Sequence, residues 1–224
     1  MVTKVSVLIP TRGRVPRLTT LLASYDRTSD RTVSELVFRI DEDDHETRAF
    51  LTGTPHHLVI GPRQGGYASL PAFFNEMAAA ASGDVLMCGN DDMVFQTEGW
   101  AEQILAVANR YPDGLFDIGV STFNPTHYPF ATVSRRVVDA LGFLWDPKIF
   151  WGDMYLRDVM AAFRRCVMVP TVQIDHDWEG FRPVPDQVFR ESDKDILRRD
   201  PTYWHGTHRV AVKSAVAKLR RLVA

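Results

Sequence analysis

The sequence has little cysteine, no long hydrophobic run and no excess of charge of either sign. Its two cysteines, Cys88 and Cys166, lie far apart in apolar runs, which excludes a disulfide framework and predicts buried thiols in a reducing compartment. The first apolar run, residues 5–9, is short and ends at Pro10, so we expect neither a signal peptide nor a transmembrane segment. Lysine plus arginine number 26 and aspartate plus glutamate 28, a net charge of −2 that provides no global attraction to nucleic acid or anionic membranes. These absences predict a cytoplasmic protein.

The chain nevertheless has ample material for a folded core. Hydrophobic residues make up 45% of the sequence and charged residues 24%, which excludes an intrinsically disordered or collagen-like chain. A length of 224 residues fits one domain, and no repeat or linker divides it. We therefore predict a single domain over residues 1–224.

Hydrophobic periodicity predicts alternating strands and helices up to residue 110. The expected strands are 4–9, 35–40, 57–60 and 84–88, and residues 166–174 are expected to be a strand pair or one strand bent around Pro170. The expected helices are 15–25, a short one ending before residue 53, 69–82, one capped by Thr97 and reaching 110, 153–164 and 210–222. Residues 111–152 are expected to be strands and loops, and a polar, aromatic tail begins at residue 183. The alternation predicts an α/β fold with a mostly parallel central sheet flanked by helices.

Polar side chains follow four of the expected strands: Thr11 and Arg12, then Asp41, then Arg63, then Asn90-Asp91-Asp92. Ligands bind beyond the carboxyl ends of strands in open α/β sheets, so these groups are expected to converge on one crevice. Adjacent carboxylates between apolar runs become tolerable when a divalent cation neutralises them, and hard oxygen ligands suit Mg²⁺ or Mn²⁺. The alternative is a simple Asn-Asp turn with a helix cap. Arg12 and Arg63 can bind a pyrophosphate through paired donors.

Several segments together resemble the nucleotide-sugar glycosyltransferases of the GT-A fold, family 2 in particular. The opening strand with its Pro-Thr-Arg end, residues 5–12, resembles the first strand of that family. The later pieces follow in the family's order: Asp41 at the nucleoside-binding position, Asn75 before an alanine-rich helix and the strand 83–87, residues 90–92 at the DXD position, and residues 151–156 as the Glu-Asp-x-x-Leu motif. Two positions depart from the pattern, since Asn90 stands at the first aspartate and Gly152 at the glutamate.

The resemblance implies a Rossmann-like GT-A domain with a nucleotide-binding half, about 1–110, and an acceptor half with a tail, about 111–224. It implies transfer of a sugar from a nucleotide-diphosphate sugar, with UDP favoured, to a hydroxyl group, with inversion. Asp92 is the implied ligand of Mn²⁺ or Mg²⁺, assisted by Asp91 and by His176 from the later strand. Asp153 is the implied catalytic base, with Asp158 one turn further on as the backup. The alternative is that Asp153 is only a helix cap or a first-turn acid. The nucleotide-sugar-binding set is Thr11, Arg12, Asp41, Arg63, Asn90 and Asp91.

Trp145 and Trp151 are the candidate acceptor-binding residues, because aromatic faces bind sugar rings and the two flank a polar loop. The alternative is that both belong to the core. The acceptor itself stays open among a protein, a small glycoside, a lipid-linked sugar and a modified DNA base.

Two other functions remain open. A nucleotidyltransferase also combines an α/β sheet with metal-binding carboxylates, but it requires a glycine-rich basic loop after the first strand, which residues 10–14 match only in part. A non-catalytic nucleotide-sugar-binding module of the same fold is favoured by Asn90 and Gly152.

Overall fold

The computed structural model of the chain describes residues 1–65, 67–122, 130–176 and 203–223. The first half contains β1 (Val5–Thr11), α1 (Val15–Thr28), β2 (Ser34–Asp41), α2 (His45–Leu51), β3 (His57–Gly61), α3 (Leu70–Ala80), β4 (Val85–Cys88), β5 (Met93–Phe95) and α4 (Trp100–Ala108). The second half contains β6 (Asp117–Ser121), β7 (Thr132–Ser134), α5 (Arg135–Leu141), α6 (Gly152–Ala162), β8 (Cys166–His176), a π-helical turn (Tyr203–His208) and α9 (Arg209–Arg220). The predicted tail from residue 183 lies outside the described residues as far as 202.

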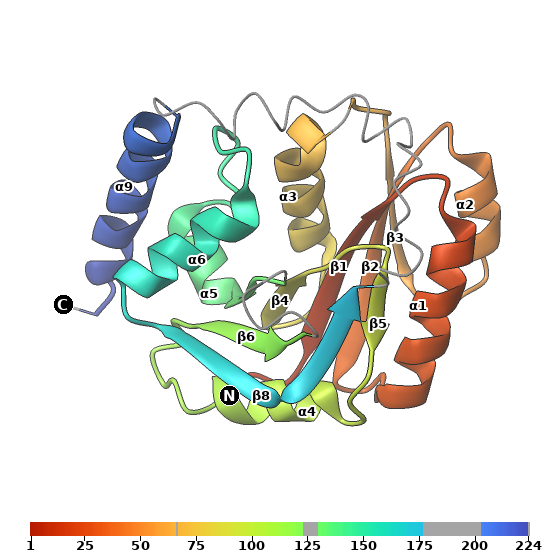
Figure 1. The fold of residues 1–224 in the computed structure, drawn as a ribbon, viewed down its shortest axis with the longest axis horizontal. Coiled ribbons are helices and arrows are strands. Elements are labelled where there is room, and N and C mark those ends of the chain that lie inside the picture. The colour runs from red at the N-terminus through yellow and green to blue at the C-terminus, as the bar shows by residue number, and fades with distance from the viewer. Residues whose placement is uncertain (66, 123–129, 177–202, 224) are drawn as a thin grey trace.

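The strands form one sheet in the order β3-β2-β1-β4-β7-β6-β8-β5 (Figure 1). β1, β2, β3 and β4 pair in parallel, as do β6 and β8. β7 is antiparallel to both β4 and β6, and β5 is antiparallel to β8. The α/β class is therefore confirmed, whereas the expectation of a mostly parallel sheet is wrong: the sheet is mixed. Every antiparallel pair involves one of two short strands, β5 or β7. Both strands come after β4, where the regular alternation of strands and helices ends.

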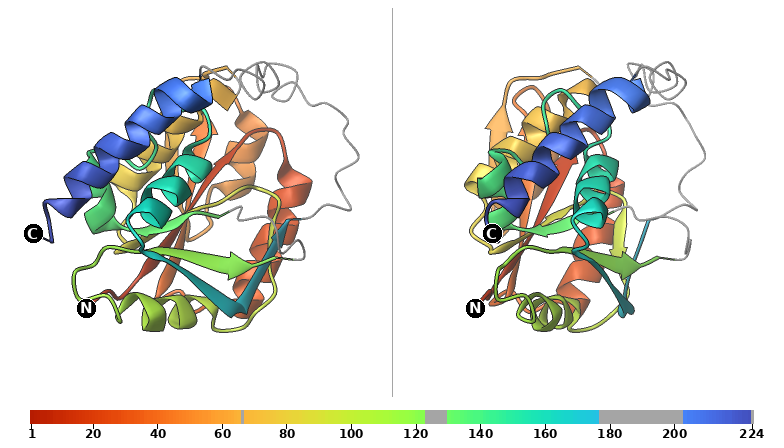
Figure 2. Two further views of the ribbon diagram at one scale, coloured as in Figure 1. Left: turned by 60° about the vertical axis from the view of Figure 1, so that its left-hand side comes forward. Right: turned by 90° about the vertical axis from the view of Figure 1, so that its left-hand side faces the viewer.

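The core lies on both faces of this sheet, which explains the nearly continuous apolar sequence of the central strands. Val5, Val7 and Ile9 of β1 belong to one buried cluster with α1 and α4, while Leu8 belongs to the other with α3, α5, α6 and α9. Successive side chains of a strand point to opposite faces, so β1 contributes to both clusters. Figure 2 shows the helices as two layers around the sheet.

The bend in β8 places the end of that strand beside the turn after β4 (Figure 1). Its first part pairs in parallel with β6, and the register shifts between Val120 and Ser121. Beyond Pro170, Gln173 still pairs with Ser121 of β6, and the last three residues pair with β5, with Met93 opposite His176. The bend therefore brings His176 next to the residue that precedes Met93 in the sequence, which is Asp92.

Several local expectations are corrected by the structure. Thr97 does not cap α4: the cap position is Gly99, and the Thr97 hydroxyl bonds the backbone at Thr171 and Gln173. The stretch expected to be strands and loops also contains helix α5. Cys88 is buried as predicted, but Cys166 is exposed. None of the described helices combines the length and apolar character needed to cross a bilayer.

Candidate functional site

The carboxyl ends of β1, β2 and β4 bring the predicted polar residues together. These strands are parallel neighbours, so Thr11, Asp41 and the turn at 90–92 lie along one edge of the sheet. The Thr11 hydroxyl donates to Asp91 Oδ2 at 3.0 Å, which joins the end of β1 to the turn after β4. The convergence expected from the sequence is therefore present in the structure.

Asp41, at the end of β2, is a buried carboxylate between two arginines. Arg12 Nη1 donates to Asp41 Oδ2 at 3.1 Å, and Arg39 Nη1 donates to Asp41 Oδ1 at 3.3 Å. Arg12 also bonds Asp43, from Nη2 to Oδ2 at 3.0 Å, and Arg63 lies 3.9 Å from the same oxygen. Burial raises the pKa of Asp41 above its ordinary value, although Arg12 and Arg39 oppose that rise. The site therefore holds a carboxylate whose charge is costly to bury.

Asp91 is almost fully buried, with 4% of its surface exposed. Its Oδ1 accepts from Arg14 Nη1 at 2.9 Å and its Oδ2 from Thr11. Burial raises its pKa despite the nearby charge of Arg14, and the adjacent Asp92 raises it further. Asp91, expected to assist a metal, is thus engaged by β1 and by the residues before α1.

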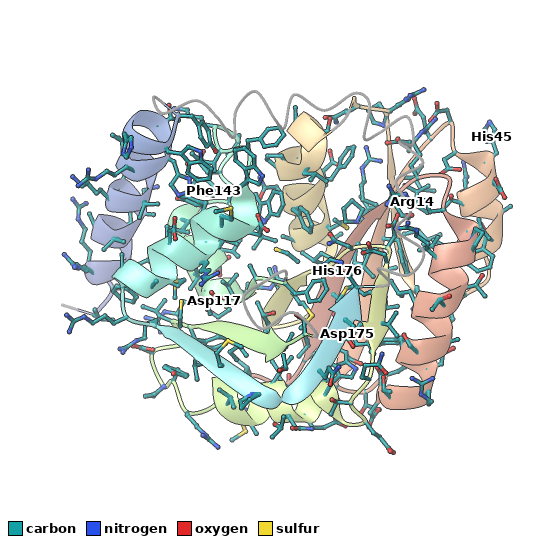
Figure 3. All side chains as sticks on the ribbon, viewed as in Figure 1. Arg14, His45, Asp117, Phe143, Asp175 and His176 are labelled. Carbon is teal, nitrogen blue, oxygen red and sulfur yellow. The ribbon has the colours of Figure 1, made fainter. Side chains whose placement is uncertain are left out.

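Asp92 pairs with the histidine that β8 supplies. His176 Nδ1 lies 3.0 Å from Asp92 Oδ1, and Arg17 Nη1 lies 3.4 Å from Asp92 Oδ2. The imidazole also packs on Phe130, with ring centroids 4.8 Å apart. Burial acts to raise the pKa of Asp92, but the hydrogen bond and charge of His176 and the charge of Arg17 outweigh it, so the pKa is lowered. Figure 3 shows His176 at the end of β8 and Arg14 beside the start of α1.

The donor set at Asp92 and His176 fits a divalent cation only in part. A carboxylate oxygen and an imidazole nitrogen are both ligands of Mn²⁺, and the two residues lie in contact. Among the residues that the structure describes, no group of three or more histidine, cysteine, aspartate or glutamate side chains is placed to hold a metal ion. The protein therefore offers two donors, and a bound ion would need further ligands from substrate or water, as Mg²⁺ and Mn²⁺ commonly do.

Asn90 lies in the turn that separates β4 from β5. Its carbonyl accepts from Met93 N at 3.3 Å, and the side chain is half-buried. The alternative prediction for this segment is an Asn-Asp turn that caps a helix. The turn is present, but it leads into strand β5 rather than into a helix.

Asp153 lies in the first turn of α6, as predicted. The buried residues Tyr155, Leu156, Val159 and Met160 anchor this helix in the core. Burial raises the pKa of the Cys88 thiol, and the charges of Asp153 and Asp117 raise it further. Cys88 is the last residue of β4, so the charge of Asp153 acts on the strand that precedes the turn at 90–92.

Gly152 has a packing reason of its own. A Cβ at this position would lie 2.0 Å from the Trp145 ring, so the glutamate of the related motif does not fit while Trp145 is there. Trp145 itself packs on Phe74, with ring centroids 4.2 Å apart, and its backbone is held by Asn75 Oδ1 and Nδ2. Only 5% of Trp145 is exposed, which argues against the predicted acceptor contact through its ring face.

Trp151 is the more accessible of the two tryptophans. It is half-buried and stacks on Trp204 of the π-helical turn, with ring centroids 5.2 Å apart and planes inclined by 19°. Its acceptor role stays a prediction. Tyr203 packs edge-on against the same indole, and its hydroxyl oxygen accepts from Phe150 N at 2.9 Å. The start of α6 and the turn before α9 therefore share one aromatic cluster.

Three arginines of this site, Arg14, Arg17 and Arg39, are not among the residues predicted from the sequence. Arg14 and Arg17 come shortly after β1 and form a basic segment together with Arg12. In the structure Arg14 pairs with Asp91 and Arg17 pairs with Asp92. Arg39 breaks the apolar run of β2, and an arginine between Phe38 and Ile40 is itself a signal, since an unpaired charge is not tolerated in a buried strand.

No protein-family model matches the sequence, and no curated protein is significantly similar to it. The structure is similar to the mannosyltransferase PcManGT from Pyrobaculum calidifontis in complex with GDP-Man and Mn²⁺, with a TM-score of 0.63 and 15% identity over 98% of this chain and 75% of that one. It is also similar to S. aureus TarS 1–349 in complex with UDP, with a TM-score of 0.59 and 14% identity over 80% of this chain and 62% of that one. The match to a longer TarS chain has a TM-score of 0.60 and 12% identity over 77% and 36%.

The chain thus has a GT-A-like glycosyltransferase fold, as its sequence motifs implied. It spans most of PcManGT but less than two thirds of either TarS chain. At these identities the likeness establishes the fold, and the activity rests on the residues of the site.

Proposed function

We propose that the protein transfers a sugar from a nucleotide-diphosphate sugar to a hydroxyl acceptor. The observation that carries this proposal is the edge at which Asp41, Asp91 and Asp92 meet four arginines and His176. A buried, mixed-charge site of this kind suits a ligand that carries both hydrogen-bonding base atoms and phosphates. The glycosyltransferase fold supports the same substrate class.

Each part of the site has a proposed task. Asp41 accepts hydrogen bonds from the base or ribose, because a carboxylate can accept from uracil N3–H or from the N–H groups of guanine. Thr11 and Asn90 line the same edge, and Arg12 and Arg63 donate to phosphate or base. Asp92 and His176 would hold Mn²⁺ or Mg²⁺, which when bound supplies positive charge for the leaving diphosphate.

Asp153 is the proposed catalytic base. As the acceptor oxygen forms its bond to the anomeric carbon, the bond from that carbon to the diphosphate oxygen breaks, and the hydroxyl proton passes to the Asp153 carboxylate. Attack opposite the leaving group inverts the anomeric carbon. This carboxylate lies in the first turn of α6, and a helix N-terminus favours negative charge.

The choice of nucleotide belongs to the proposal as well. Sequence resemblance favours UDP, while the similar solved structures include one with GDP-Man and one with UDP. A panel of UDP-sugars and GDP-sugars is therefore the right set of donors to test.

The experiment measures release of UDP or GDP from that panel, with Mn²⁺ and with EDTA. We expect slow hydrolysis of at least one donor that requires Mn²⁺ and is lost in Asp92→Asn. The matched control is Asp26→Asn, which removes an exposed carboxylate that pairs with Arg31 at the far end of α1. Binding of a donor without any turnover would favour the non-catalytic module. Pyrophosphate release from a nucleoside triphosphate and a sugar phosphate would instead identify a nucleotidyltransferase.

A further inference from the structure

Arg39 is an arginine inside the sheet, two residues before Asp41 on the same face of β2. Only 1% of its surface is exposed. The desolvation of a buried guanidinium is costly unless its donors are all engaged, so such a residue is informative about what surrounds it.

The guanidinium joins three separate segments of the chain. Nε donates to Glu76 Oε2 of α3 at 2.6 Å, and Nη2 donates to the Pro62 carbonyl after β3 at 2.9 Å. Nη1 donates to the Ile40 carbonyl at 2.6 Å and to Asp41 Oδ1 at 3.3 Å. The plane also lies over the Phe73 ring of α3, 4.4 Å from its centroid. A planar fork with five N–H donors can make these bonds together, whereas a lysine ammonium cannot.

The end of β3 leaves room for this group. A Cβ on Gly61 would lie 2.8 Å from Arg39 Nη2 and 3.1 Å from Cζ. Gly61 is the partner of Asp41 in the β2–β3 pairing, and its backbone conformation does not demand glycine. Space for the guanidinium is therefore a sufficient reason for glycine at this position.

We propose that Arg39 is a positioning residue of the nucleotide site: it fixes the Asp41 carboxylate and the segment after β3, which carries Arg63, in one arrangement that receives the base. This inference rests on the proposed function. Arg12 holds the other Asp41 oxygen from the solvent side, so the carboxylate is oriented from both sides while lone pairs remain for a ligand.

Arg135 provides a contrast within the same protein. It is half-buried and donates to three backbone carbonyls, those of Ala78, Ala81 and Gly83, at the opposite end of the sheet. It touches no residue of the candidate site in these bonds. Arg135→Lys is therefore a matched control that disturbs an internal arginine without disturbing Asp41.

The test titrates UDP and GDP, each with Mn²⁺, into the whole protein and its Arg39→Lys, Gly61→Ala and Arg135→Lys variants by calorimetry. We expect Arg39→Lys to lose about tenfold or more in affinity for the preferred nucleotide. Gly61→Ala, which displaces the guanidinium by another route, is expected to lose affinity in the same direction. Arg135→Lys is expected to bind as the wild type does, even where its melting temperature falls. Gly61→Ala keeps the test decisive where Arg39→Lys does not fold.

A pH profile of binding separates positioning from general stability. Asp41 is faced by Arg12, Arg39 and Asp43, so weakening the Arg39 contact leaves its ionised form less favoured. The acid limb of nucleotide binding is then expected to move to higher pH in Arg39→Lys and to stay unchanged in Arg135→Lys. Affinity within twofold of wild type and an unmoved acid limb in the folded Arg39 and Gly61 variants would overturn the inference. A wild type that binds neither nucleotide would instead overturn the proposed function.

Discussion

The two ends of the same central strands use carboxylates in opposite ways. At the amino end of β2, Glu35 accepts from Ser6 Oγ at 2.6 Å, from Ser82 N at 2.7 Å and from Lys4 Nζ at 2.7 Å. Burial acts to raise its pKa, but these bonds prevail and lower the pKa to about 2. The ionised form is strongly favoured in the fold.

At the carboxyl end the balance is reversed for two of the three carboxylates. Asp41 and Asp91 bond to arginines, yet burial still raises the pKa of each. Only Asp92, in contact with His176, has a lowered pKa. Ionisation of Asp41 and of Asp91 therefore costs the fold free energy, whereas ionisation of Glu35 and of Asp92 stabilises it.

This difference teaches where function lies in the molecule. A group that serves the fold is satisfied by its neighbours, as Glu35 is. Carboxylates whose pKa is raised by burial and lowered by neighbouring arginines are typical of sites that bind charged ligands. The predictions that follow test this division, from the largest expected effect to the smallest.

Asp153→Asn is expected to reduce turnover by roughly 10²-fold or more, because it removes the proposed base. Donor binding and the melting temperature are expected to stay close to wild type. The control is Asp158→Asn on the same helix, whose carboxylate bonds His208 at 2.9 Å. The measurement is sugar transfer to the true acceptor under saturating donor. Near-normal transfer by Asp153→Asn would show that Asp153 is only an acidic residue in the first turn of α6 and not the catalytic base.

Asp41→Ala is expected to weaken binding of the preferred nucleotide by about tenfold, or roughly 1.4 kcal/mol. The loss has two causes, since the base loses its acceptor and Arg12 loses one of its carboxylate partners. Isothermal titration with UDP and with GDP measures it, and Asp26→Ala serves as the exposed-carboxylate control. Unchanged affinity for both nucleotides would place Asp41 outside the site.

Glu35→Gln is expected to destabilise the fold, whereas Asp91→Asn is not. Glu35→Gln is expected to lower the free energy of unfolding at pH 7 by about 1 kcal/mol, allowing for screening by solvent. Asp91→Asn is expected to leave stability unchanged or to raise it, because a buried charge is removed while an amide oxygen can still accept from Thr11 or Arg14.

The pH dependence follows from the lowered pKa of Glu35. A carboxyl group with a depressed pKa stabilises the fold above its ordinary pKa of 4.5, and this contribution is lost as the pH falls toward 2. Denaturant unfolding of the wild type and Glu35→Gln is therefore expected to show a stability difference at pH 7 that shrinks below pH 4.5. Equal stability of the two proteins at pH 7 would contradict the account of the amino end.

The first half of the fold could be predicted from the sequence because the patterns that indicate it are local. Short apolar strands, stripes at helical spacing and polar residues directly after each strand are visible within about ten residues. The convergence of Thr11, Asp41 and residues 90–92 then follows from parallel pairing alone, and the structure contains it.

The second half depends on partners that are distant in sequence. β7 inserts antiparallel between β4 and β6, and no local pattern predicts this position. Pro170 predicts the bend in β8, but not that the strand pairs with β6 before the bend and with β5 after it. The contacts of Arg14, Arg17 and Arg39 could not be predicted for the same reason, because the sequence does not show which carboxylate each arginine pairs with. Thr97 was misassigned because its hydroxyl is used by β8 rather than by the helix that follows.

The central claim is a metal-dependent nucleotide site at the carboxyl ends of β1, β2 and β4. The most direct measurement is a calorimetric titration of UDP and of GDP into the wild type and Asp92→Asn, each with Mn²⁺ and with EDTA. We predict that Mn²⁺ tightens binding to the wild type by well over tenfold and that Asp92→Asn abolishes most of this gain. Equal affinity of the wild type with Mn²⁺ and with EDTA would contradict the claim.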